Sequence, residues 1–381
     1  MLGALRLDRH EEPELPAGDN SWQAALSFAD RTQLTLPWRS RLAASSLWDH
    51  VPAATRSRLD ANLAGNTERL ARLKQAFAEI AGRLDEAGVD FLVLKGLSHG
   101  ADFAPDPRLR VQYDIDLFCL RDAAGRARDA LLDLGYEPHH PMDGFPLDHL
   151  PAMVRKTGWR WRGDYFDPEI PPSVDVHFRF WDPETERLPA PGTAQFWNRR
   201  VGSEIAGRHV YQMDLVDQLG YAGLHAVRHL LRGSLRLYHV YEIACFLECR
   251  RDDAALWRRW LELHSPALRM LETIAFRLAQ KYFGAPLPAA AGSLPDGAER
   301  WLGSYAWSPV EAHFRPNKRE LLLHLSLLET RADRWSVARR RLAPLRLPPP
   351  FQGSYGSFVL SRLVHHARLL APTLWELARW R

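Results

Sequence analysis

The sequence predicts a mixed α+β fold, in which a small mixed sheet is flanked by N-terminal and C-terminal helical segments. Apolar residues follow three- and four-residue spacing before residue 87 and again after residue 217, which is typical of helices that bury one face. Between these regions they form short runs or alternate with polar residues, as in strands. An order of strand, helix, strand, helix and further strands is typical of a mixed sheet.

The N-terminal segment is expected to be helical from about residue 21 to 87. Its clearest pattern covers residues 67–87, with apolar positions at Leu70, Leu73, Phe77, Ile80 and Leu84. Asn66 is a suitable N-cap for a helix that begins there, and Gly88 is a suitable stop.

Two strands are predicted next. The apolar run 89–94 ends in a Lys-Gly turn, and residues 111–120 form the second strand. Because side chains alternate across a strand, Asp114 and Asp116 share one face. The buried side beneath them is expected to hold Ile115, Leu117 and Cys119.

The pattern then returns to helix at 123–134, which Gly135 ends. Residues 159–166 and 174–180 are expected to form a strand pair, and a hairpin is expected to turn at Gly207. In the later strand of the pair, Val174 and Val176 face one side, while Asp175 and His177 face the other.

These patterns divide the chain into three segments. Residues 1–87 form an N-terminal arm and helical segment, 88–215 the sheet-forming core, and 216–381 a mostly helical region. The 381 residues are 46% hydrophobic and 25% charged, which is ordinary for a globular protein. A net charge of +4 permits a nucleic-acid partner without requiring one.

Cysteine use and the N-terminus predict a reduced, cytoplasmic protein. The three cysteines, Cys119, Cys245 and Cys249, form no Cys-x-x-Cys motif, and so sparse a set argues against a disulfide framework. The sequence begins without a signal-peptide core, and no apolar run approaches the length that spans a membrane.

The most informative polar residues are Asp114, Asp116 and Asp175, which lie on two apolar strands. Carboxylates held close together repel one another unless a cation lies between them. Mg²⁺ prefers oxygen ligands and commonly reaches a protein with substrate phosphates. Three carboxylates on adjacent strands can hold two divalent ions about 3.5–4 Å apart, which activates a nucleophile and neutralises a leaving phosphate.

Four motifs, taken in order and spacing, resemble the uncharacterised bacterial nucleotidyltransferase family of the DNA polymerase beta superfamily. They are Leu94-Lys95-Gly96, Arg110-x-x-x-Asp114-Ile115-Asp116-Leu117, Leu134-Gly135-Tyr136 and Val174-Asp175-Val176-His177. The likeness covers roughly residues 30–270. It implies a nucleotidyltransferase core at 88–215 that moves a nucleoside monophosphate from a nucleoside triphosphate to an acceptor.

The resemblance also implies roles for the catalytic residues. Asp114 and Asp116 would bind two Mg²⁺ ions, with Mn²⁺ as an alternative. Asp175 would ligate the catalytic ion and help to deprotonate the acceptor hydroxyl. His177 shares the face of Asp175, where it either orients that carboxylate, contacts substrate, or serves as a structural histidine.

Nucleotide binding is expected around the Lys-Gly turn. Gly96 would let the backbone approach the triphosphate, while Lys95 and Arg110 would counter phosphate charge. The wider superfamily usually has a Gly-Ser pair before its acidic motif, whereas here Leu97 follows Gly96 and Ser98 comes one residue late.

Two other functions are weighed against the enzyme. A catalytically inactive module that binds nucleotide or a partner would keep the fold, and the displaced Ser98 favours it. A metal-dependent glycosyltransferase can also use an Asp-x-Asp motif, but it explains neither the Lys-Gly turn nor Asp175. The base of the nucleotide and the acceptor, whether small molecule, peptide or RNA, stay open.

Two further patterns favour structural interpretations. His225 and His229 have a helical spacing that can bind zinc, but similar histidines occur in the resembled family, and we favour a site wall or polar core. The C-terminal region is rich in arginine, which permits contact with an acidic surface such as a membrane or RNA, although solvated helix faces are the favoured interpretation. These arginines are Arg331, Arg334, Arg339, Arg340, Arg341, Arg346, Arg362, Arg368, Arg379 and Arg381.

Overall fold

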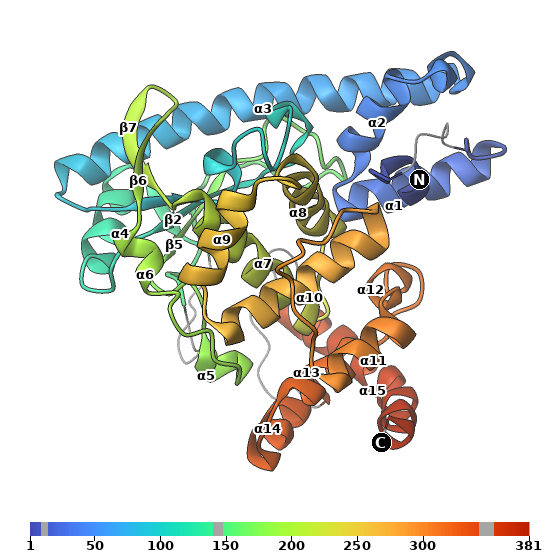
Figure 1. Ribbon diagram of the computed structural model, residues 1–381. Helices are drawn as coiled ribbons and strands as arrows, with labels where there is room; N and C mark the ends of the chain where they lie inside the picture. The colour runs from blue at the N-terminus through green and yellow to red at the C-terminus, as the bar shows by residue number, and fades with distance from the viewer. Residues whose placement is uncertain (9–13, 140–147, 343–353, 381) are drawn as a thin grey trace.

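The computed structural model describes residues 1–8, 14–139, 148–342 and 354–380 (Figure 1). Its strands are β1 (Leu92–Leu94), β2 (Asp114–Phe118), β3 (Tyr136–Pro138), β4 (Met153–Arg155), β5 (Ser173–His177), β6 (Val201–Ile205) and β7 (Arg208–Gln212). They form one seven-stranded mixed sheet in the order β3-β4-β5-β2-β1-β7-β6. Helices flank the sheet, so the predicted α+β class is confirmed.

Helices precede, interrupt and follow the strands. Before and within the sheet region these are α1 (Asp19–Thr32), α2 (Thr35–Ala43), α3 (Ala53–Glu86), α4 (Ala124–Asp133), α5 (Pro183–Glu186) and α6 (Gln195–Asn198). After it come α7 (Leu215–Leu231), α8 (Leu237–Cys249), α9 (Ala254–Leu263), α10 (Pro266–Phe283), α11 (Asp296–Tyr305), α12 (Ser308–Glu311), α13 (Glu320–Leu327), α14 (Arg331–Leu342) and α15 (Tyr355–Arg379). Helices α7 to α10 confirm the helical region predicted up to about residue 284.

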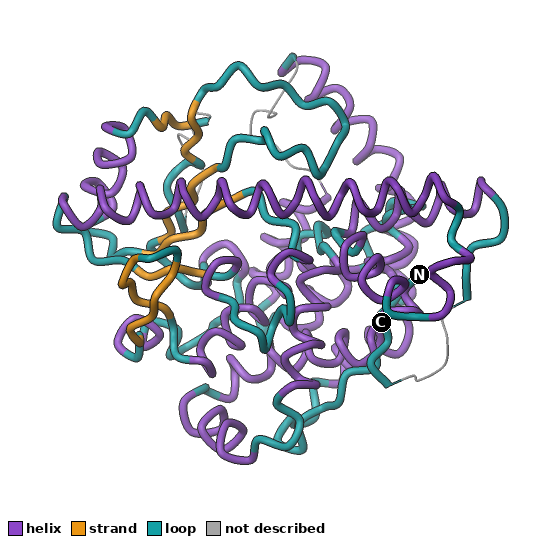
Figure 2. Tube along the Cα trace, turned by 90° about the horizontal axis from the view of Figure 1, so that it is seen from above, coloured by secondary structure: helices purple, strands orange, loops and turns teal. Residues whose placement is uncertain are grey.

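One face of the sheet is covered by α3 and α4, and Figure 2 shows the long helix α3 crossing over the strands. The three- and four-residue spacing of α3 gives it an apolar side that packs on alternate residues of the central strands. This cluster includes Leu73, Phe77, Ile80, Leu84, Val93, Ile115, Leu117, Cys119, Leu131, Val174 and Val176. The predicted buried side of the second strand is therefore confirmed.

The opposite face packs against the C-terminal helices. Leu94 and Phe118 point to this face and belong to the cluster that also contains apolar residues of α7, α8 and α10. Helix α7 approaches its neighbours closely at Gly220, where a Cβ would lie 2.7 Å from the His264 ring. Because glycine has no Cβ, it permits this approach, and α7 packs tightly between the sheet and α10.

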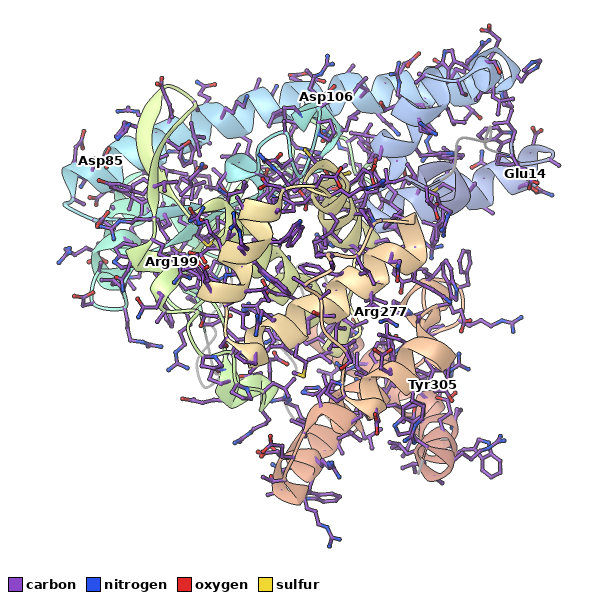
Figure 3. All side chains as sticks on the ribbon, in the orientation of Figure 1. Glu14, Asp85, Asp106, Arg199, Arg277 and Tyr305 are labelled. Atoms are coloured by element: carbon purple, nitrogen blue, oxygen red, sulfur yellow. The ribbon has the colours of Figure 1, made fainter. Side chains whose placement is uncertain are left out.

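A buried ionic cluster fixes the same helices. His264 Nδ1 lies 2.9 Å from Glu272 Oε1, and its Nε2 lies 3.1 Å from Asp217 Oδ1. Arg199, labelled in Figure 3, also pairs with Asp217, at 2.6 Å. Burial alone would lower the pKa of His264, but the charges of Glu272 and Asp217 raise it to about 9.

The predicted helix start at Asn66 is wrong, because α3 is continuous from Ala53 to Glu86. Asn66 instead lies in the middle of the helix, where its amide Nδ2 donates to the backbone carbonyls of Arg108 and Arg110. These two bonds anchor the loop before β2 to α3. The stop at Gly88 is confirmed, since the helix ends at Glu86 and Gly88 has a φ of +63°.

The predicted strand at 159–166 is also wrong, although the hairpin at Gly207 is confirmed by β6 and β7. Glycines with positive φ interrupt the region at Gly158 and Gly163, and the segment forms a loop. The antiparallel neighbour of β5 is β4, which lies a few residues before the segment 159–166.

The C-terminal helices pack on α10 and α13. Arg277 of α10, labelled in Figure 3, pairs with Glu299 of α11 at 3.0 Å. Arg340 and Arg341 donate to the backbone carbonyls of Thr185 and Leu231. Contact with an acidic surface stays a prediction, and Arg346 and Arg381 lie outside the described residues.

The predicted three-part division also stays a prediction. One hydrophobic cluster contains Trp22 of the first segment, Leu94 of the second and Phe276 of the third. Within the described ranges, none of the helices is both long enough and apolar enough to cross a membrane.

Candidate active site

The three aspartates lie on one face of two adjacent strands. In the parallel pair β2 and β5, Asp116 is the register partner of Asp175, and Asp114 is the partner of Ser173. Asp114 and Asp116 are two residues apart, so all three carboxylates are on the same side of the sheet. This is the side opposite Ile115 and Val174, as the sequence predicted.

A cavity of about 270 Å³ opens above these carboxylates, between the sheet and helices α7 and α8. Its polar walls combine carboxylates, histidines and a surplus of cationic side chains. It is lined by Gln33, Lys95, Arg110, Val111, Tyr113, Asp114, Asp116, Asp148, His149, Asp175, His177, His225, Arg228, His229, Arg232, Arg236, Tyr238 and His239. The cavity therefore brings cationic side chains next to the acidic groups.

Asp116 is the buried centre of the carboxylate group. Its Oδ1 lies 2.8 Å from Lys95 Nζ and 3.3 Å from His177 Nε2. Burial alone would raise the pKa of Asp116, but Lys95 and His177 hold it well below its usual range. The pKa of Lys95 is correspondingly raised, although burial opposes the shift, so both groups are charged at neutral pH.

Asp175 has the opposite character. Burial and the nearby charges of Asp116 and Asp114 raise its pKa to about 8, and burial with the charge of Asp116 also raises the pKa of Asp114. Within the described part of the chain, the buried Oδ1 of Asp175 has no hydrogen-bond partner. An unpaired carboxyl oxygen beside two other carboxylates is a suitable ligand for a divalent cation, which would replace the proton.

The Lys-Gly turn places Lys95 in a conformation that non-glycine residues rarely adopt, with φ +45° and ψ −157°. At Gly96, φ is +32° and a Cβ would lie 2.1 Å from Nε2 of Gln112. Gln112 in turn donates to the Asp114 carbonyl at 2.7 Å. Glycine is thus required here because the turn packs directly against the segment that leads into β2.

Ser98 stabilises this turn through a hydrogen bond. Its hydroxyl donates to the Lys95 carbonyl at 2.9 Å, and the side chain is buried. Neither Gly96 nor Ser98 is among the residues that line the cavity. Their predicted contact with nucleotide stays a prediction, whereas their contacts in the structure hold Lys95 in position.

Arg110 lines the cavity but is paired within the protein. Its Nε lies 2.8 Å from Glu242 Oε1, and His99 Nδ1 lies 3.2 Å from the same oxygen. Burial opposes ionisation of Glu242, yet Arg110 and His99 lower its pKa to about 2. Arg110 can still attract phosphate, but its charge is balanced by a carboxylate on α8.

Residues 18–284, more than two thirds of the chain, match a family described as uncharacterised nucleotidyltransferase. The chain belongs to this family. Membership supports nucleotidyl transfer as the general class of function and a nucleotide as substrate. Comparisons with curated proteins and with solved structures found no match.

Several residues in and next to the cavity were missed by sequence reasoning. Asp148 comes from the loop before β4 and pairs with Arg228 of α7 at 2.7 Å. Glu242 and His239 come from α8, where they look like ordinary polar positions of a half-buried helix. Only the packing of α7 and α8 over the sheet brings them to the aspartates, and no local motif could have identified them.

Proposed function

We propose that this protein transfers a nucleoside monophosphate from a nucleoside triphosphate to a nucleophilic acceptor, with pyrophosphate as the leaving group, on a site of the DNA polymerase beta type. The observation that carries the proposal is the convergence of Asp114, Asp116 and Asp175 on one face, through the pairing of Asp116 with Asp175. A glycosyltransferase would need only the Asp-x-Asp pair and leaves Asp175 without a role.

The donor set fits Mg²⁺, or Mn²⁺ in its place, because it consists of carboxylate oxygens of which one is buried and unpaired. Asp114, Asp116 and Asp175 would hold the ions. When bound, they would neutralise phosphate charge and lower the pKa of the attacking hydroxyl.

In this proposal, Asp175 accepts the proton of the acceptor hydroxyl. Its pKa is about 8 in the metal-free protein, and binding of the cations would release this proton and leave the carboxylate ionised to act as the base. In the reaction the acceptor oxygen forms a bond to the α-phosphorus, its proton passes to a carboxylate oxygen, and the bond from the α-phosphorus to the bridging oxygen breaks. That oxygen leaves with pyrophosphate.

The cationic wall would bind the phosphates. Lys95 stays protonated beside Asp116, and Arg228, Arg232 and Arg236 line the same cavity from α7 and the start of α8. Arg232 pairs with Glu186 and Arg228 with Asp148, whereas Lys95 pairs with Asp116, a proposed metal ligand, so Lys95 and Arg236 are the cations on which we place the greatest weight. Positioning and charge neutralisation of this kind supply most of the catalysis in phosphoryl transfer.

A nucleotide-binding module without catalysis is the second candidate. It is favoured by Ser98, whose hydroxyl is committed to the Lys95 carbonyl and does not reach the cavity. Such a module would bind nucleotide in the presence of Mg²⁺ but release no pyrophosphate with any acceptor.

The decisive experiment is calorimetric titration of each non-hydrolysable nucleoside triphosphate, with and without Mg²⁺, followed by pyrophosphate-release assays with an acceptor panel. Mg²⁺-dependent binding that Asp114→Asn/Asp116→Asn abolishes and the exposed control Asp122→Asn retains would support the site. Pyrophosphate release would then separate the enzyme from the binding module. If the wild type binds no triphosphate under any condition, the proposal is wrong.

A further inference from the structure

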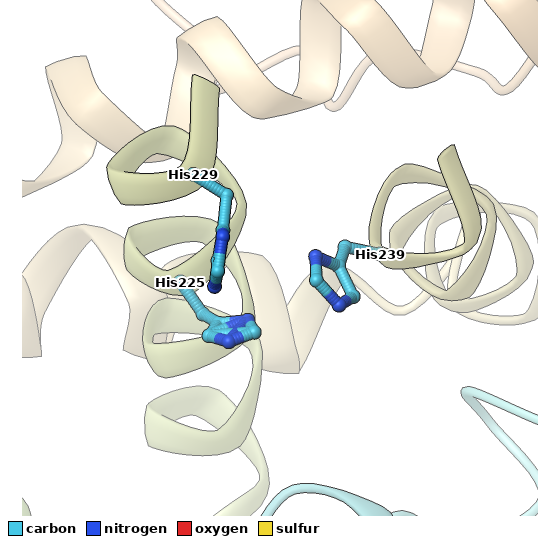
Figure 4. Close-up of side chains that lie close together, drawn as sticks. All are labelled: His225, His229 and His239. Carbon is cyan, nitrogen blue, oxygen red and sulfur yellow. The ribbon is translucent and has the colours of Figure 1, made fainter. Parts of the chain in front are cut away.

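Three histidines gather on the helical wall of the cavity. His225 and His229 lie one turn apart on α7, and His239 faces them from α8 (Figure 4). The ring centroids are 4.5 Å apart for His225 and His229, 4.4 Å for His225 and His239, and 5.2 Å for His229 and His239. One ring nitrogen from each lies within 4.8 Å of the other two.

The hydrogen bonds within the described residues do not occupy every ring nitrogen of the cluster. His239 Nδ1 is buried and has no hydrogen-bond partner within the described residues. His229 Nδ1 lies 3.1 Å from Ser234 Oγ, which orients the ring and leaves Nε2 free. A ligating histidine commonly has its second nitrogen fixed by such a partner.

The surroundings keep the imidazoles in the form that binds metal. Burial holds the pKa values of all three histidines far below the usual range. The charge of Lys95 lowers the pKa of His225 and His229 further, and His229 lowers that of His239. The rings are therefore neutral at physiological pH, with lone pairs available for coordination.

We propose that His225, His229 and His239 form a site for a divalent transition-metal ion of the Zn²⁺ class, separate from the carboxylate site. Three imidazole nitrogens suit Zn²⁺ and similar divalent transition-metal ions, whereas Mg²⁺ requires oxygen ligands. Three protein ligands leave a fourth position for water or a substrate atom, and all three histidines line the cavity. The sequence favoured a structural role because it could not show that His239 completes the pair on α7.

Lys95 connects this site to the carboxylates. Its Nζ lies 3.3 Å from His225 Nε2 and 2.8 Å from Asp116 Oδ1. Lys95 thus lies between the two sites, and the histidine site does not depend on the chemistry proposed for the aspartates.

The test uses the full chain, loaded with Zn²⁺ and dialysed against buffer that contains excess Mg²⁺, with retained zinc measured by elemental analysis. We expect one retained equivalent in the wild type and in Asp116→Asn. Since loss of a mere orienting partner costs about 10–100-fold in affinity, His239→Gln should weaken Zn²⁺ binding at least about 100-fold. His209→Gln, at an exposed histidine of β7, is the matched control and should change nothing.

A spectroscopic measurement on the wild type covers the case in which a histidine variant does not fold. X-ray absorption at the zinc edge should show nitrogen ligands at about 2.0–2.1 Å with the outer-shell scattering of imidazole rings. Zinc that is lost in Asp116→Asn but kept in His239→Gln would place the ion on the carboxylates and overturn the proposal. A wild type that retains no zinc, or zinc with only oxygen ligands, would overturn it equally.

Discussion

Asp116 and Asp175 face each other across the parallel strands β2 and β5, yet they have opposite ionisation behaviour. Asp116 is ionised because Lys95 and His177 contact it, whereas Asp175 has no such partner among the described residues and its pKa rises to about 8. The protein itself thus stabilises the ionised form of Asp116, whereas the carboxyl group of Asp175 is available to a ligand. This asymmetry is typical of sites at which charge is brought in by substrate or metal.

Asp175→Asn should abolish transfer while leaving the protein as stable as the wild type or more so. The amide has nearly the shape of the carboxyl group but removes the repulsion from Asp114 and Asp116. We expect activity to fall at least about 10³-fold, the upper range for loss of one electrostatic contact in an active site. Pyrophosphate release and thermal unfolding measure the two effects, and a variant that keeps its turnover would remove Asp175 from the mechanism.

The contribution of Asp175 to the stability of the metal-free protein should decrease as pH rises from about 4 to about 8, measured as the difference in unfolding free energy between the wild type and Asp175→Asn. Asp175 has a raised pKa in the folded state, so its contribution is fully present below the pKa of the unfolded chain and is lost as pH rises through about 8. Urea unfolding of both proteins across this range measures this difference. Mg²⁺ should restore stability at the alkaline end only in the wild type.

The contribution of His264 and its carboxylate partners to the free energy of unfolding should be lost at a higher pH than that of Asp175. The folded-state pKa of His264 is about 9, so its contribution is fully present below about pH 6.5 and disappears as pH rises through 9. His264→Gln should destabilise the protein by about 3 kcal/mol or more below pH 7, since it leaves the buried Glu272 without its cation, whereas Asp217 keeps Arg199. Denaturant titrations at pH 6 and pH 10 check this, and an equal loss at both would contradict it.

Gly96→Ala should destabilise the fold by about 1–3 kcal/mol, the cost of a residue forced into a sparsely populated backbone region. The new Cβ also meets the side chain of Gln112. Adding Gln112→Ala should relieve the steric part and leave the backbone part.

Gly125→Ala is the matched control for the Gly96→Ala variants. Gly125 lies in α4 with nothing within 4 Å of an added Cβ, so alanine should stabilise the helix by about 0.5–1 kcal/mol. Urea unfolding of these three variants and the wild type separates the contributions. A Gly96→Ala protein as stable as the wild type would contradict the geometry of the turn.

Much of the sheet could be predicted from local pattern. The alternation around Asp114 and Asp175 correctly placed Ile115, Leu117, Val174 and Val176 in the core and the acidic residues on the other face. Alternation was misleading at 159–166, where glycines with positive φ break an apparently strand-like pattern. Asn66 was misassigned because a long helix contains polar positions that resemble a cap when their tertiary partners are unknown.

The sequence by itself determined the class of fold, the strands that carry the aspartates, and the side of each strand that is buried, because these follow from the period of the backbone. Only the tertiary structure decided that β2 and β5 are parallel neighbours with Asp116 opposite Asp175. It also decided that Glu242 neutralises Arg110 and that His239 joins the histidines of α7. These contacts join segments far apart in the chain, and they depend on how whole helices pack on the sheet rather than on the pattern within any one of them.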